Sequence, residues 1–201
     1  ADAILITSDL PFMAVLTSLD LGHNGLGPEG GEAIAAALTE GSSVLTSLHL
    51  GDNNLQVEGG KAIAAALEKN SVLTSLNLNS NRVGPEGAKA LADALQVNAV
   101  MTSINVGNNS LNEEAALGIV RAARQHGKMT FLGLAACEIG PSGAKEIAKY
   151  VSVTRVLTNL SVANKGIKGK AAQQLAAAAL SSKSLEVFSE VPIKELREDK
   201  L

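Results

Sequence analysis

Two pairs of histidine and aspartate side chains are the residues of this sequence whose types and spacing could support chemistry. Asp20 and His49 are 29 residues apart, and His23 and Asp52 have the same separation. An imidazole beside a carboxylate can bind a divalent metal ion or transfer a proton. A structural repeat of that length would bring the members of each pair together on neighbouring strands, about 4.8 Å apart.

Two serines extend the first pair toward the composition of a hydrolytic triad. Ser18 precedes Asp20 by two residues, and Ser47 precedes His49 by two. On a strand, Ser47 and His49 would be about 7 Å apart, which is too far for the hydrogen bond between a nucleophile and its base. No segment predicts an enclosed pocket that would exclude water. We therefore interpret both pairs as opposite-charge contacts between strands, with a metal-dependent enzyme at Asp20 and His49 as the less favoured hypothesis.

The elements that must position these residues come from a repeated unit. The string VLTSLDLGHNGLGPEGGEAIAAAL recurs twice as a near copy and three more times with greater divergence. The first two copies start 29 residues apart and the later ones 28, so a single insertion near residue 42 is required. Six copies in register predict a repeat architecture. They start at Val15, Val44, Val72, Val100, Lys128 and Val156.

Each unit has two halves with different apolar periods. The first half reads L-x-x-L-x-L, and this alternation predicts a short strand with Leu19 and Leu21 facing inward. The second half places Ile34 and Leu38 on one face of a helix. Proline and glutamate mark the helix starts, where a missing N–H is tolerated and a carboxylate meets the positive end of the helix dipole. These markers are Pro28, Pro85 and Pro141, with Glu29, Glu58, Glu86 and Glu114.

A strand followed by a helix, repeated in parallel, predicts an α/β solenoid with one parallel sheet. Helices are wider than strands, so the stack is expected to curve with its strands on the concave side. The absence of Trp, with one Tyr and three Phe, fits a thin core of small side chains. We expect a single domain over residues 1–201, with a partial unit at 1–14, six repeats at 15–184, and a partial unit or cap at 185–201.

The pattern L-x-x-L-x-L-x-x-N/C-x-L, with a full helix and a unit near 28 residues, resembles the ribonuclease-inhibitor-like class of leucine-rich repeats. The resemblance covers Val15 to about Ser184. It implies a right-handed leucine-rich-repeat solenoid, with a parallel concave sheet and convex α-helices. Similar arrays occur in ribonuclease inhibitor, NOD-like receptors and Ran GTPase-activating protein. The resemblance implies protein recognition inside the cell through the concave face and its rims, without identifying the partner.

One polar position of this motif is occupied by asparagine in four successive units. An asparagine amide can donate to and accept from backbone groups that the turn leaves unpaired, and each such hydrogen bond contributes on the order of 1 kcal/mol. Cys137 fits the family pattern as a buried structural thiol. Lys165 departs from it, because an ammonium group cannot accept a hydrogen bond and is costly to bury. The predicted turn ladder is Asn24, Asn53, Asn81, Asn109 and Cys137.

The side chains between the inward leucines of each strand are predicted to face the concave surface. This surface is small, polar and nearly uncharged, and only Phe131 could act as an apolar anchor, although binding hot spots favour Trp, Tyr and Arg. The candidate partner-binding residues are Ser18, Asp20, Ser47, His49, Ser75, Asn77, Asn79, Ser103, Asn105, Phe131, Asn159 and Ser161.

Charge and composition restrict the partners and the compartment. A net charge of −3 predicts no nucleic acid partner, and the apolar runs are too short to span a membrane. A single cysteine and the lack of a signal segment indicate the cytoplasm. Residues 1–100 carry 11 acidic and 4 basic side chains, a sum of −7, whereas residues 101–201 carry 9 and 13, a sum of +4. This asymmetry suggests drift of solvated side chains, an acidic partner at the basic end, or weak head-to-tail self-association.

The sequence therefore predicts a protein-interaction module or scaffold that is a fragment of a larger intracellular protein. We predict no enzymatic activity, no cofactor, and another protein of unknown identity as the partner. The alternative hypothesis is a GTPase-activating protein similar to the Ran activator, for which no motif can be transferred residue by residue.

Overall fold

The computed structural model describes residues 15–39, 44–163, 167–189 and 191–192 of the chain. Within these ranges strand and helix alternate along the chain. The predicted partial unit at 1–14, the insertion near residue 42, and Lys165 lie outside the described residues. The strands are β1 (Ser18–Asp20), β2 (Ser47–His49), β3 (Ser75–Asn77), β4 (Ser103–Asn105), β5 (Phe131–Gly133), β6 (Asn159–Ser161), β7 (Val187–Phe188) and β8 (Val191–Pro192). The helices are α2 (Gly27–Thr39), α3 (Gln56–Lys69), α4 (Gly84–Val97), α5 (Glu113–His126), α6 (Pro141–Val153) and α7 (Gly169–Ser181).

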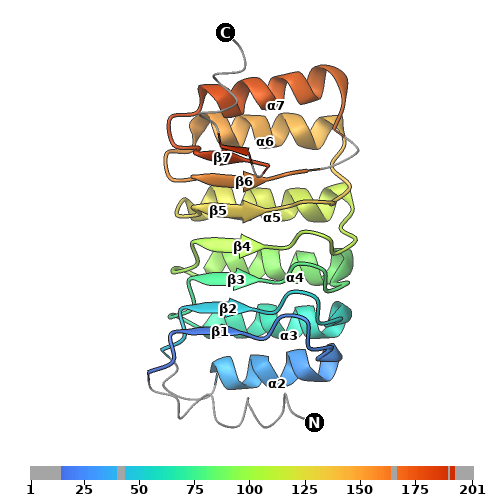
Figure 1. Ribbon diagram of the computed structural model, residues 1–201, viewed down its shortest axis with the longest axis vertical. Helices are drawn as coiled ribbons and strands as arrows, with labels where there is room; N and C mark the ends of the chain where they lie inside the picture. Colours follow the sequence, from blue (N-terminus) through green and yellow to red (C-terminus); the bar gives the residue numbers. More distant parts are fainter. Residues whose placement is uncertain (1–14, 40–43, 164–166, 190, 193–201) are drawn as a thin grey trace.

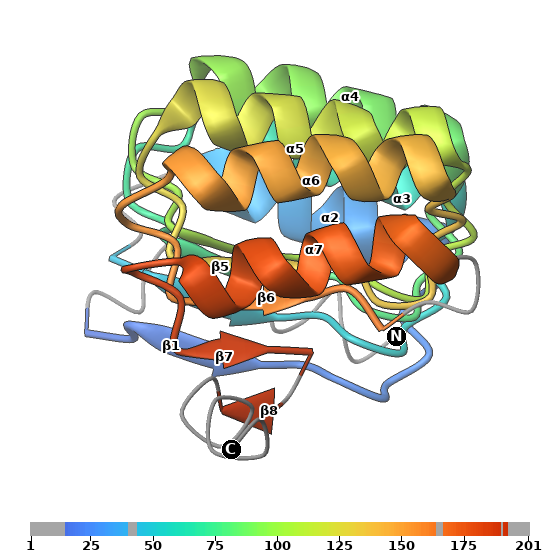
Figure 2. The same ribbon diagram turned by 90° about the horizontal axis from the view of Figure 1, so that it is seen from above.

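The strands form one sheet in chain order, with the helices stacked along one of its faces (Figures 1 and 2). Strands β1 to β7 are parallel, which confirms the predicted α/β solenoid. The last unit keeps its register, since Phe188 pairs with Leu160. The exception is β8, which pairs antiparallel with β7. The chain reverses there through Ser189, whose φ of 48° is in the left-handed region, so β8 covers the outer edge of β7.

The core is a thin layer between the sheet and the helices. In β2, β3 and β4 the central residue is buried, while its two neighbours are only half-buried. Leu76 in β3, for example, is buried together with Leu91 of α4. Burying a leucine side chain contributes about 1.5–3 kcal/mol, and no repeat can bury its leucines without neighbours. None of the described helices combines the length and apolar character needed to cross a membrane.

The distance between neighbouring helices depends on small residues at their first turns. A Cβ atom at Gly31 of α2 would lie 2.8 Å from the Cα of Gly59 in α3, so this close approach requires glycine. Helices α5 and α6 approach each other less closely than the other neighbours do. Glu113 and Leu117 stand on α5 at the positions of Pro85 and Lys89 one repeat earlier, and the buried Leu117 adds bulk at this boundary.

Candidate interaction surfaces

The register of the sheet gathers the predicted surface residues into two columns on the face opposite the helices. These residues are exposed or half-buried, whereas the residue between them is buried in β2 to β6. Gly133 is an exception, because it is buried. Asn79 lies half-buried just beyond β3. The first column is Ser18, Ser47, Ser75, Ser103, Phe131 and Asn159, and the second is Asp20, His49, Asn77, Asn105, Gly133 and Ser161.

Several polar side chains of the second column are bound to their own backbone. The Asp20 carboxylate accepts the Gly22 N–H at 2.8 Å. In the same way Asn77 accepts the N–H of Asn79 at 2.9 Å, and Asn105 accepts that of the second residue after it at 3.0 Å. These contacts use one oxygen of each side chain and fix its direction. The column is therefore preorganised, and only part of its hydrogen-bonding capacity is left for other contacts.

The two histidine–aspartate pairs meet as the repeat spacing predicted. His49 Nδ1 lies 3.0 Å from Asp20 Oδ1, and His23 Nδ1 lies 3.6 Å from Asp52 Oδ2. The Gly22 N–H and then His49 lower the pKa of the exposed Asp20 carboxyl below its ordinary value. Each pair brings together two side chains of metal-binding type, and the described residues contain no group of three. The geometry is that of side-chain contacts between equivalent positions of two neighbouring repeats.

A buried row of asparagines joins the turns that follow the strands. Asn53, Asn81 and Asn109 are fully buried. The Oδ1 of each accepts the N–H of the equivalent asparagine one repeat earlier, at 2.8 to 3.0 Å. The Nδ2 of Asn81 donates to the carbonyls of Leu50 at 2.7 Å and Leu78 at 3.0 Å, one in each of two successive repeats. These bonds tie the second, third and fourth repeats each to its predecessor.

The row changes at both ends. Asn24, in the first described turn, is exposed. Cys137 is buried, and its Sγ lies 3.8 Å from the carbonyl oxygen of Ala135. Burial raises the pKa of the Cys137 thiol to about 12, so the side chain stays protonated near neutral pH. A thiol cannot supply the paired donor and acceptor groups of an amide, and the fifth turn is held differently.

A second asparagine row lies at the opposite edge of the sheet, and the strand motif of the sequence did not predict it. Asn70 and Asn98 follow the ends of α3 and α4 and are buried. Asn98 donates to the carbonyls of Leu67 at 2.8 Å and Asn70 at 3.0 Å, and its Oδ1 accepts the Met101 N–H at 2.8 Å. The signal in the sequence is a spacing of 28 residues between two asparagines outside the strand motif.

His126 occupies the next position of this second row and cannot continue it. Its two ring nitrogens are buried without a hydrogen-bond partner among the described residues. Burial lowers the pKa of His126, the nearby Asn98 backbone opposes this in part, and the positive charge of Lys128 lowers it further. Because the unfolded chain binds the proton more readily, the neutral ring contributes stability above about pH 6.5 that is lost as the pH falls.

We therefore expect the urea concentration at the unfolding midpoint to decrease as the pH is lowered from about 7.5 to about 5.5. The substitution His126→Gln should make that decrease smaller. The pKa of Asp20 is also shifted, but a lowered carboxyl pKa acts below this window. Equal slopes in the two proteins would contradict a role for His126. The measurement is a series of urea titrations followed by circular dichroism at each pH.

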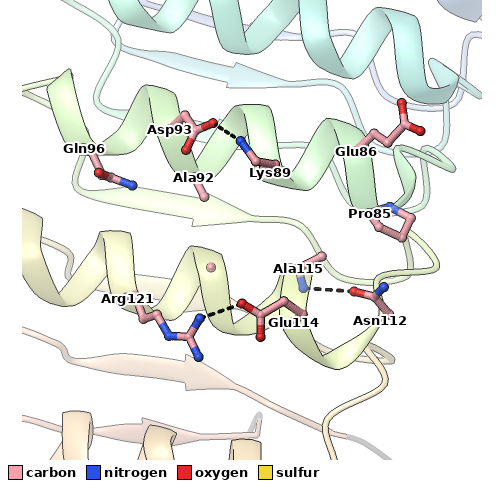
Figure 3. Close-up of a pocket in the computed structure, with 11 residues that line it drawn as sticks. Pro85, Glu86, Lys89, Ala92, Asp93, Gln96, Asn112, Glu114, Ala115 and Arg121 are labelled. Carbon is pink, nitrogen blue, oxygen red and sulfur yellow. Dashed lines mark hydrogen bonds and ion pairs between the residues drawn. The ribbon is translucent and has the colours of Figure 1, made fainter.

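An open groove runs between α4 and α5 on the helical face, and no feature of the sequence predicted it. Figure 3 shows its lining, which encloses about 490 Å³. Two ion pairs flank it, Lys89 with Asp93 at 2.8 Å and Arg121 with Glu114 at 2.8 Å. Arg121 also contacts a carboxylate of α6 at 2.9 Å, and both contacts raise its pKa. The small residues that line the groove are Ala92, Ala115 and Gly118.

Glu113 of α5 caps the start of α6. One of its carboxylate oxygens accepts the Gly143 N–H at 2.7 Å, the Ser142 hydroxyl at 2.8 Å and the Gly140 N–H at 3.2 Å. The Ser142 hydroxyl and then the Gly143 N–H lower the pKa of Glu113. Helix α6 has no acidic residue in its own first turn, so the preceding repeat supplies the carboxylate that its dipole favours.

The turns, the buried asparagines and the parallel strands agree with a comparison of sequences. Residues 13–35, 41–64 and 69–92 match the family model described as Leucine Rich repeat. The fold is that of a leucine-rich-repeat solenoid. None of the proteins with curated annotation matches it in sequence.

Two solved structures share the fold of this solenoid. The tropomodulin C-terminal domain of Caenorhabditis elegans has a TM-score of 0.63 and 13% identity, over 75% of this chain and 91% of that one. The leiomodin-1 actin-binding site 2 has a TM-score of 0.51 and 18% identity, over 99% of this chain and 92% of that one. At these identities the likeness establishes the fold alone.

Proposed function

We propose that this solenoid is a protein-interaction module of the ribonuclease-inhibitor-like type, which acts in the cytoplasm as part of a larger protein. The observation that carries the proposal is the sheet face opposite the helices. Parallel strands in strict register present two columns of exposed and half-buried side chains there. The buried asparagine rows hold β1 to β4 in place, so binding to that part of the face would order few additional groups and cost little conformational entropy.

Phe131 is the apolar centre of this face. It lies in β5, where the register places it between Ser103 of β4 and Asn159 of β6, and it is half-buried. An aromatic side chain fixed on a strand and surrounded by small polar groups resembles the arrangement of an interface anchor with its polar rim. We therefore assign Phe131 as the main apolar contact of the proposed partner site.

We expect Phe131→Asp to weaken capture of the partner by about 30-fold, the loss typical of an interface hot spot. The matched control is Ala65→Asp, which introduces the same charge at an exposed position of α3. The measurement is quantitative affinity capture with mass spectrometry. Equal melting temperatures of the wild type and the two variants show that all three proteins are folded. Actin is the first defined partner to test, because the leiomodin-1 structure is described as an actin-binding site.

A partner that binds Phe131→Asp and the wild type equally would move the site away from the sheet face. If only Ala65→Asp abolishes capture of the partner, the binding site lies on the helices. Stimulation of a Ran-type GTPase by the wild-type chain would instead favour the GTPase-activating alternative, and zinc-dependent heat or a zinc-dependent melting temperature would favour the metal site at Asp20 and His49.

A further inference from the structure

The loops that lead from α3 to α7 into the strands that follow them lie along one edge of the solenoid, at the left in Figure 1. Neighbouring loops are tied together, since Lys128 Nζ donates to the carbonyl of Ala99 at 2.9 Å and Ser184 Oγ donates to that of Thr154 at 3.4 Å. The strand backbones continue the connection, with the Thr158 N–H bound to the Thr130 carbonyl at 2.9 Å. This edge is therefore a fixed surface.

The later repeats place positive charge along this edge. Arg155 and Lys183 occupy the same position in two successive repeats, and Arg124 and Lys128 flank the end of α5. Residues 124–130, 152–158 and 180–186 contain these four cations and one carboxylate, Glu186, a net charge of +3. The basic residues at 168 and 170 lie at the start of α7, toward the opposite edge. We call Arg124, Lys128, Arg155 and Lys183 the basic rim.

Among the described residues, no carboxylate forms a salt bridge with the cations of the basic rim. The salt bridges of Lys and Arg between described residues involve Lys61, Lys89 and Arg121, and none involves the basic rim. Among these four cations, only Arg124 lies in the last turn of a helix. Arg155 follows the C-cap residue of α6, and Lys183 follows that of α7.

Exposed valines accompany these cations. Val153 is 59% exposed and Val156 is 38% exposed, and they lie on either side of Arg155 in the sequence. Val97, at the position equivalent to Val153 two repeats earlier, is 66% exposed. A row of cations, with exposed apolar side chains in the same loop as Arg155, presents both electrostatic and hydrophobic contacts.

We propose that the basic rim binds an extended acidic segment of a partner protein, in which aspartate or glutamate alternates with apolar residues. This inference rests on the proposed role as a protein-interaction module. An extended chain advances about 3.3 Å per residue, and successive repeats are about 5 Å apart at the strands and about 8–10 Å at the helices. Carboxylates two residues apart can thus follow the cations of successive repeats, with the apolar residues against Val153 and Val156.

The test is fluorescence anisotropy with a short labelled peptide of alternating glutamate and leucine. We expect Arg155→Glu with Lys183→Glu to weaken binding by about tenfold, since each reversed charge contributes modestly at an exposed site. The matched control is Lys145→Glu with Lys149→Glu on α6, which changes the net charge equally at exposed positions of the helical face. Binding to the wild type should weaken as salt rises, and the variants should melt like the wild type.

Equal loss in the rim variant and the α6 variant would show unspecific attraction and overturn the proposal, as would a peptide that the wild type does not bind. Tighter binding of this protein to phosphatidylserine vesicles or polyuridine RNA than to the peptide would also overturn the proposal. So would sedimentation that shows the rim binding a second copy of this chain. Phe131→Asp separates this proposal from the previous one. If peptide binding depends on Phe131 and not on Arg155, only the rim proposal is refuted. If peptide binding depends on the rim, while affinity capture of the partner is unchanged by Phe131→Asp, only the sheet-face proposal is refuted.

Discussion

Replacing Asn81 by alanine is expected to lower the free energy of unfolding by about 3 kcal/mol or more, because several buried groups lose their partners together. Its Oδ1 accepts the N–H groups of Asn53 at 3.0 Å and Leu55 at 3.3 Å. Its Nδ2 donates to the carbonyls of Leu50 at 2.7 Å, Leu78 at 3.0 Å and Asn79 at 3.1 Å. Water cannot replace these bonds, since Asn81 has no exposed surface.

Asn24→Ala is the control for this experiment, because Asn24 holds the same motif position at an exposed turn. Its side chain donates to the carbonyls of Leu21 and Gly22, groups that water can reach in part. We expect a loss of about 1 kcal/mol or less there. Urea unfolding followed by circular dichroism compares the two variants, and equal losses would show that the buried row contributes no more than an ordinary turn.

Gly31→Ala is expected to destabilise the fold by about 2 kcal/mol, although alanine is the better helix former. The added Cβ would lie 2.8 Å from the Cα of Gly59 in α3. A backbone atom cannot rotate away as a side chain can, so α2 and α3 must move apart and lose contacts along their length.

Gly118→Ala provides the opposite case on α5. The nearest atom to its new Cβ would be the Ala92 Cβ at 3.7 Å, an ordinary contact, so the helix preference should prevail and stabilise the protein by about 0.5–1 kcal/mol. Thermal melting of both variants makes the comparison. A stabilised Gly31→Ala would mean that the first helices are not held by this close approach.

The repeat spacing was sufficient to predict the strands, the helices and the pairing of equivalent residues. The pairing of Asp20 with His49 follows from the sequence alone, because a constant period fixes the register between neighbouring strands. The residues of the polar face follow in the same way, yet the use of the Asn77 oxygen by the Asn79 backbone depends on the path of the turn. A pattern of residue types does not distinguish a side chain that faces a partner from one that holds its own loop.

The second asparagine row, the groove and the basic rim could not be predicted from the sequence, for different reasons. Asn70 and Asn98 lie outside the strand motif, so their shared spacing has no structural meaning until the ends of the helices are known. The groove depends on the small residues Ala92, Ala115 and Gly118 coming together where α4 and α5 pack. The charge asymmetry is visible in the sequence, where residues 165, 168 and 170 form its densest cluster. Lys170 lies at the start of α7 and Lys183 beyond its end, so the two lysines belong to opposite edges of the solenoid, and only the direction of the helix shows this.

The boundary between the fourth and fifth repeats differs from the others in two ways. Helices α5 and α6 stand apart there, and the asparagine row gives way to Cys137. In a linear array the coupling between neighbours sets cooperativity. Strands β4 and β5 still pair across this boundary, and Glu113 and Arg121 still contact α6. We nevertheless expect the helices to separate here first, so that mechanical strain on one end would open that part before the other.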